Sequence, residues 1–87
     1  MYTHAGNNRI IRTRDIVGIF DMDTATMAMP TREYLRAAEK DKRMVNIKEE
    51  IPKSFIVTAK KGEKDMVYVS QISTSALIGR VKSGISE

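Results

Sequence analysis

Two runs of β-branched and aromatic residues, joined by a short turn, constrain the fold of this chain most strongly. The runs cover residues 54–59 and 66–72, and the six residues between them include Gly62, which suits a turn. Strands linked by so short a turn pair antiparallel. We therefore expect a β-hairpin here, and with it a small antiparallel or mixed sheet.

The first twenty residues predict further strands with a bend between them. A short strand is expected over residues 2–4, and residues 9–20 are rich in Ile and Val, which favour strands. The alternation of apolar and polar side chains breaks near Arg14, and beyond the break Ile16 and Phe20 share one face. This break predicts a bulge or a bend.

The middle of the chain predicts a helix. Pro30 has the backbone angle of a first helical turn, and the residues after it repeat at helical spacing over residues 31–42. Tyr34, Leu35 and Ala38 form a narrow apolar stripe, with charged side chains outside it. One face of this helix should therefore pack on the core.

Two shorter elements complete the expected fold. Residues 44–47 predict a short strand, and the hydroxyl side chains of residues 73–75 suit the start of a helix that runs toward Gly84. The order of elements predicts an α+β fold, in which residues 1–87 form a single domain with a small sheet, one central helix and a short C-terminal helix.

The size of the chain favours self-association. A domain of 87 residues buries only about 60% of the surface that its unfolded chain exposes, and this one has no Cys for disulfides. Contacts between copies can supply the missing stability.

The sequence shows no sign of a secretion signal or a membrane span. Its first residues have no basic segment before an apolar run, and no apolar run approaches the roughly 20 residues that cross a bilayer. We expect a cytoplasmic protein without membrane contact.

The residues for catalysis or metal binding are largely missing. The chain has no Cys and one His, His4, which is more simply a strand side chain than a catalytic base. Asp21 and Asp23 resemble the start of a calcium loop, but Ala25 stands at the next ligand position, so capping of a turn is the stronger interpretation. The glycines are too scattered for a phosphate-binding loop. We therefore expect no enzyme, no metal site and no cofactor.

Basic residues are concentrated in two stretches of a chain whose net charge is +4. Guanidinium groups suit phosphate oxygens and guanine edges, and ammonium groups suit sequence-independent phosphate contact. The alternative is that these charges only keep strand edges and turns soluble, or that Arg14 and Asp15 pair across a subunit interface. The first stretch contains Arg9, Arg12 and Arg14, and the second contains Lys53, Lys60, Lys61 and Lys64.

The run Thr13-Arg14-Asp15-Ile16-Val17-Gly18-Ile19-Phe20-Asp21 closely resembles the bacterial extracellular-matrix regulatory family, in particular its RemB branch. The start Met1-Tyr2-x-His4-x-Gly6 and the stretches 52–58 and 68–77 resemble the same branch, so the similarity covers almost the whole chain. It implies a small cytoplasmic protein with a LytTR-like fold. In the RemA branch, a closed homo-oligomeric ring binds DNA and activates biofilm-matrix genes.

The resemblance also implies that the residues for DNA contact differ between the RemA branch and this chain. In the RemA branch a basic residue on the early strand and an arginine pair before the central hairpin serve DNA binding, whereas here those positions fall near Asp15 and at Glu50-Ile51. Our leading hypothesis is a DNA-binding transcriptional regulator that acts as a homo-oligomeric ring. The alternative, prompted by Glu49-Glu50, is a protein-interaction ring that binds no nucleic acid. The candidate DNA-binding residues are Arg9, Arg12, Arg14, Lys53, Lys60 and Lys61.

Overall fold

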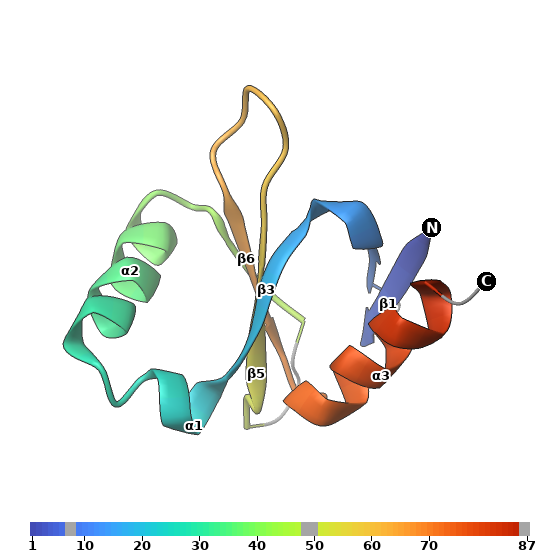
Figure 1. Ribbon diagram of the computed structural model, residues 1–87. Coiled ribbons are helices and arrows are strands. Elements are labelled where there is room, and N and C mark those ends of the chain that lie inside the picture. The colour runs from blue at the N-terminus through green and yellow to red at the C-terminus, as the bar shows by residue number, and fades with distance from the viewer. Residues whose placement is uncertain (7–8, 48–50, 86–87) are drawn as a thin grey trace.

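A four-stranded mixed sheet lies at the centre of the molecule (Figure 1). The computed structural model describes residues 1–6, 9–47 and 51–85, with side chains as far as Lys82. The strand order is β3 (Ile16–Asp21), β5 (Ser54–Thr58), β6 (Met66–Ser70) and β4 (Met44–Asn46). The antiparallel pairing of β5 with β6 confirms the predicted hairpin, and β4 joins β6 in parallel.

The N-terminal strands form a separate two-stranded sheet. β1 (Tyr2–Gly6) pairs antiparallel with β2 (Arg9–Arg12), and the 3-10 turn η1 (Thr13–Asp15) then leads into β3. This turn is the bend that the sequence predicted near Arg14.

One sequence prediction for β3 was wrong. Ile16 and Phe20 were expected on one face, but the register shifts between Ile16 and Gly18, as in a β-bulge. Ile16 therefore pairs with Thr58 on one face, and Phe20 pairs with Phe55 on the other. An extra residue in one strand reverses the alternation of every side chain beyond it.

Three helices complete the fold: α1 (Met22–Ala25), α2 (Met29–Lys40) and α3 (Thr74–Ile85). α2 begins and ends two residues earlier than predicted, with Pro30 in its first turn. It ends there because Asp41 leaves the helical conformation and Lys42 has a positive φ of 60°. α3 is the expected closing helix, and the hydroxyl of Ser73 accepts a hydrogen bond from the Ala76 N–H at 3.3 Å.

The two central strands are covered on both faces (Figure 1). On one face, α2 packs its Ala38 in a cluster with Phe55 and Val67. On the other, Ile56 packs with residues of the N-terminal hairpin and with Leu77 of α3. The α+β fold class is thereby confirmed, with helices on both sides of the central sheet. None of the helices in the described residues has the length and apolarity needed to cross a bilayer.

Asp21 caps α1, a single helical turn where the sequence predicted a capped turn. Its carboxylate accepts a hydrogen bond from the Thr24 N–H at 2.9 Å. This bond, with a smaller contribution from the Thr24 side chain, lowers the pKa of Asp21 below its ordinary value of 3.8.

Removing this cap should make stability depend less on pH. Because the pKa is lower in the folded state, the ionised carboxylate stabilises the fold at every pH above 3.8, and this contribution is lost as the pH falls through the lowered value. We expect Asp21→Ala to be less stable than the parent protein at neutral pH, with the difference shrinking in acid. Urea unfolding across the pH range measures it. Asp21→Asn keeps an acceptor oxygen that does not titrate, and a variant difference that does not change with pH would contradict the expectation.

Candidate nucleic-acid interface

The loop between β5 and β6 projects from one end of the central sheet (Figure 1). It carries Lys60 and Lys61, both exposed, and Gly62 at a φ of 81° makes the turn. The Glu63 N–H donates to the Lys60 carbonyl at 3.0 Å, which closes the loop. Two of the predicted DNA-binding side chains therefore lie at the tip of a protruding hairpin.

The η1 turn lies beside the base of this loop. The Ala59 N–H donates to the Asp15 carbonyl at 2.9 Å, so that the two segments are in direct contact. Arg14 is exposed on η1, next in sequence to Asp15, just as Lys60 is next to Ala59. The structure thus brings Arg14 to the same end of the sheet as Lys60 and Lys61.

Arg9 of β2 lies against Tyr68, the middle residue of β6. Its guanidinium carbon lies 5.9 Å from the centre of the Tyr68 ring, in the geometry of a cation–π contact. Tyr68 lines a small hollow of about 60 Å³ together with Lys60 and Lys64. Because Arg9 lies over the Tyr68 ring, this arrangement suits phosphate contact better than base stacking.

We call these side chains the loop-end cluster. Arg14 lies on the η1 turn beside the loop, and Arg9 is joined to the loop lysines through Tyr68, which lines the same hollow as Lys60 and Lys64. Lys64 belongs to it although it was not among the predicted site residues, and its place in the loop beside Lys60 was the signal that could have identified it. The loop also carries two acidic residues, Glu63 and Asp65. The loop-end cluster consists of Arg9, Arg14, Lys60, Lys61 and Lys64.

Arg12 differs from the residues of the loop-end cluster because its guanidinium is paired with a carboxylate. It pairs in register with Tyr2 on β1, and its guanidinium nitrogen lies 3.9 Å from the Asp15 carboxylate. The described ion pair of Asp15 is thus with Arg12 of the same chain. A guanidinium that already has a carboxylate partner offers a phosphate less net charge.

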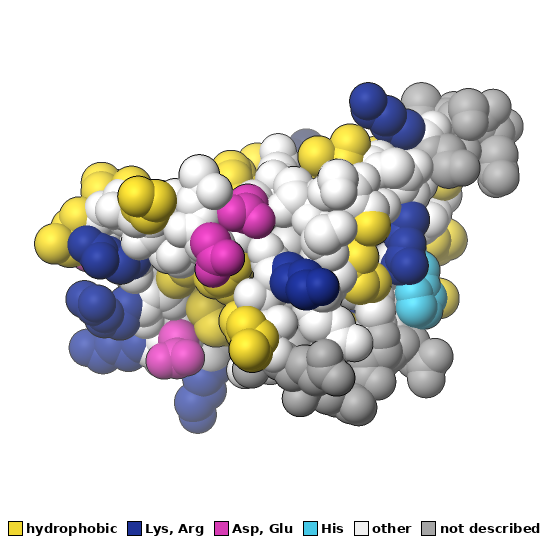
Figure 2. All heavy atoms as spheres, turned by 90° about the horizontal axis from the view of Figure 1, so that it is seen from below, with side chains coloured by type: hydrophobic (Ala, Val, Ile, Leu, Met, Phe, Trp, Pro, Cys, Tyr) yellow, Lys and Arg dark blue, Asp and Glu magenta, His cyan; other side chains and the backbone are white. Residues whose placement is uncertain are grey.

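Lys53 stands at the opposite end of β5 from Lys60. Its carbonyl accepts a hydrogen bond from the Met22 N–H at 2.9 Å, which places it beside α1 and the exposed Asp21 and Asp23. Figure 2 shows this end of the molecule, where Asp and Glu side chains lie among those of Lys and Arg. The structure therefore separates Lys53 from the other predicted site residues. Glu49-Glu50, which prompted the alternative hypothesis, lies outside the described residues.

A polar network anchors the loop that carries the lysines. Asp65, at the end of the loop, accepts a hydrogen bond from the Tyr34 hydroxyl of α2. Arg43 donates to the Asp65 carbonyl at 2.9 Å and lies 3.3 Å from its carboxylate. A second carboxylate, that of Asp41, lies 3.4 Å from Arg43. The base of the loop is thus tied to α2 and to the segment before β4.

The comparisons with known proteins agree with the resemblance seen in residues 13–21. The chain is 35% identical to extracellular matrix regulatory protein B of Bacillus subtilis (strain 168) over 82 residues, which cover 94% of this chain and 91% of that protein. The chain belongs to the bacterial extracellular matrix regulatory protein family. No family model matches it.

Asp65 and Asp41 offer a matched test of how the loop is held. We expect Asp65→Ala to lower the free energy of unfolding by about 1–2 kcal/mol, because it removes the partner of Tyr34 and one carboxylate of the largely buried Arg43. Asp41→Ala removes a single, more exposed ion-pair partner and should cost less than about 0.5 kcal/mol. Urea unfolding of both variants decides this, and equal losses would show that the network does not anchor the loop.

Proposed function

We propose that this protein is a non-enzymatic, DNA-binding regulator of matrix genes that acts in the cytoplasm as a homo-oligomeric ring. The observation that supports DNA contact is the loop-end cluster, in which the exposed lysines of the β5–β6 loop lie beside Arg14 of η1 and are joined to Arg9 of β2 through Tyr68. The regulatory role rests on membership of the family and on the name of the Bacillus subtilis relative.

Repetition of the cluster supplies the affinity in this proposal. One subunit of net charge +4 offers few phosphate contacts and would bind DNA weakly. In a ring, each further contact is intramolecular once the first has formed, which raises avidity by roughly 10²–10⁴-fold. Cyclic symmetry also places every copy of the cluster on the same side of the ring, where one duplex can meet several of them.

The geometry revises which predicted residues we assign to DNA. Arg9, Arg14, Lys60 and Lys61 remain, and Lys64 joins them. Lys53 lies at the other end of β5, where its carbonyl is bonded to Met22 between Asp21 and Asp23, and Arg12 is paired with Asp15. Neither is assigned to phosphate contact in this proposal.

A salt series with duplex DNA tests the proposal. The logarithm of the binding constant should fall linearly with the logarithm of the salt concentration, by about 0.9 for each phosphate neutralised. The triple variant Arg14→Ala, Lys60→Ala, Lys61→Ala should lose about tenfold or more in affinity at low salt and should show a shallower slope. Fluorescence anisotropy with labelled duplexes measures both quantities.

The control removes the same charge elsewhere. Arg32, Arg36 and Lys82 are exposed on α2 and α3, which carry no member of the loop-end cluster. Their triple alanine variant should keep most of the affinity and the slope. If both triple variants lose the same affinity, net charge and not the cluster governs binding. Absence of salt-dependent binding in the parent protein would favour a protein-interaction ring.

A further inference from the structure

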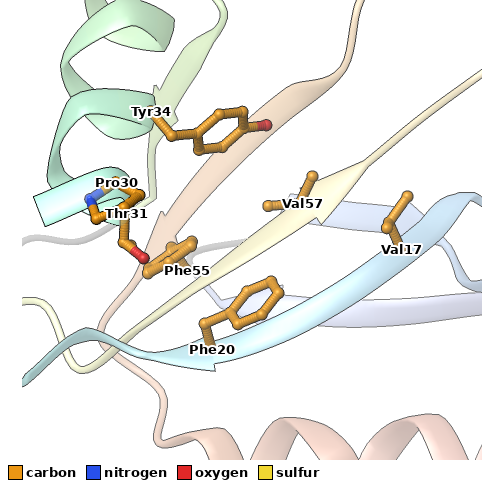
Figure 3. A pocket seen from close by; sticks show the side chains of 7 residues that line it. All are labelled: Val17, Phe20, Pro30, Thr31, Tyr34, Phe55 and Val57. Atoms are coloured by element: carbon orange, nitrogen blue, oxygen red, sulfur yellow. The ribbon is translucent and has the colours of Figure 1, made fainter. Parts of the chain in front are cut away.

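An apolar groove opens between the edge strand β3 and the start of α2 (Figure 3). Its volume is about 360 Å³, and side chains from β3, β5 and α2 line it. Most of these side chains are apolar, so displacing water from the groove is favourable. The lining residues are Val17, Phe20, Pro30, Thr31, Tyr34, Phe55 and Val57.

The shape of the groove follows from the bulge in β3. The bulge turns Phe20 toward the α2 side, where its ring stacks on Phe55 with centroids 5.1 Å apart. Gly18 leaves room for this ring, because a Cβ there would lie only 2.6 Å from it. Phe20 nevertheless stays 41% exposed. The local sequence therefore holds a large aromatic ring at the surface in a defined position.

The apolar surface continues beyond the groove. Val17 at its rim is 67% exposed, and Met29, next to Pro30 at the start of α2, is 56% exposed. A contiguous apolar surface around a groove marks a place where another molecule binds.

A second apolar surface lies on the outer face of the β1–β2 hairpin. Thr3, Ala5 and Ile11 turn inward and are buried, while Tyr2 is 66% and Ile10 is 59% exposed. The hairpin lies on the other side of the central sheet from α2 (Figure 1). One chain thus presents two different apolar surfaces on opposite sides of the sheet.

We propose that the occupant of the groove is a second copy of this chain, which inserts the outer face of its β1–β2 hairpin. This proposal deepens the ring assembly of the proposed function and rests on it. Charge favours the pairing: Asp21 and Asp23 are exposed on the segment that follows β3, whereas Arg80 of α3 lies beside the hairpin, where it donates to the His4 carbonyl at 2.7 Å. Acidic and basic edges then meet around an apolar centre.

The contact proceeds through side chains and not by addition of a strand. Among the described residues β3 pairs only with β5, which leaves its outer edge open, but the bulge at Val17 interrupts the ladder that a partner strand would need. Because the two surfaces differ, the contact is head-to-tail, which closes into a ring when the rotation between neighbours divides a full turn. Arg14 and the lysines of the loop-end cluster lie outside both surfaces, and the Arg9 side chain lies against Tyr68 of the central sheet and not on the outer face of the hairpin, so the cluster stays available for DNA.

Two complementary variants test the pairing of surfaces. Val17→Asp disrupts the groove, and Ile10→Asp disrupts the hairpin; both side chains are already exposed, so the fold should tolerate the change. Each variant alone lacks one of the two surfaces that every contact needs and should be a monomer. An equimolar mixture still has one intact groove and one intact hairpin, so it should form a dimer of twice the 9.8 kDa chain mass and nothing larger.

Analytical ultracentrifugation measures these masses, and circular dichroism confirms that each variant is folded. Ile51→Asp, at a position 82% exposed and outside both surfaces, should keep the parent mass. If either first variant unfolds, Met29→Asp replaces it for the groove and Tyr2→Asp for the hairpin.

The possible failures are distinguishable. A parent protein that is a monomer at micromolar concentration would overturn both the ring and this interface, and leave the groove to another ligand. A parent oligomer that survives both variants would overturn the interface alone. A single variant that dimerises by itself would show that like surfaces meet, and a mixture that stays monomeric would show that the groove and the hairpin do not bind each other. Either result would overturn the head-to-tail pairing.

Discussion

The fold depends on burying both faces of β5 and β6. Phe55 and Ile56 are neighbours in sequence and point to opposite faces, and each is almost completely buried. A strand with apolar side chains on both faces needs a covering layer on each side, so α2 packs on one face and the N-terminal hairpin with α3 on the other. A chain of 87 residues has little left with which to cover β3 at the sheet edge. The exposed groove follows from this shortage.

The sequence predicted well the elements whose signal is local. The central hairpin, the short strand at 44–46, both long helices and the bend near Arg14 are confirmed, because the side-chain periodicity or the turn residues of each act within a few positions. The face of Phe20 was wrong for a related reason. The bulge at Val17 depends on how β3 registers against β5, more than 30 residues later in the chain, and simple alternation carries no sign of it.

The candidate site could be predicted in part. Lys53 and Lys60 flank one strand, so their separation to opposite ends of the sheet was already implied once residues 54–59 were identified as a strand. The contact of Arg9 with Tyr68 had no such signal in the sequence, because it joins β2 of the covering hairpin to β6 of the central sheet. The same holds for Arg14, whose place beside Lys60 depends on the backbone hydrogen bond between Ala59 and Asp15. Charge counts gave the candidate residues, and only tertiary contacts show which of them lie near one another.

In the proposed ring, two tasks that a small chain could easily bring into conflict would be kept on separate surfaces. Apolar association needs surfaces of low charge, and DNA contact needs dense positive charge, so a shared surface would weaken both. Here the groove and the hairpin lie on the two sides of the sheet, while the loop-end cluster lies at its end, along the strand direction. Copies joined side to side would therefore repeat the cluster along one rim without covering it. A neighbouring copy would therefore do two things at once: it would add its own positive charge to that of the subunit, and it would cover the exposed edge strand.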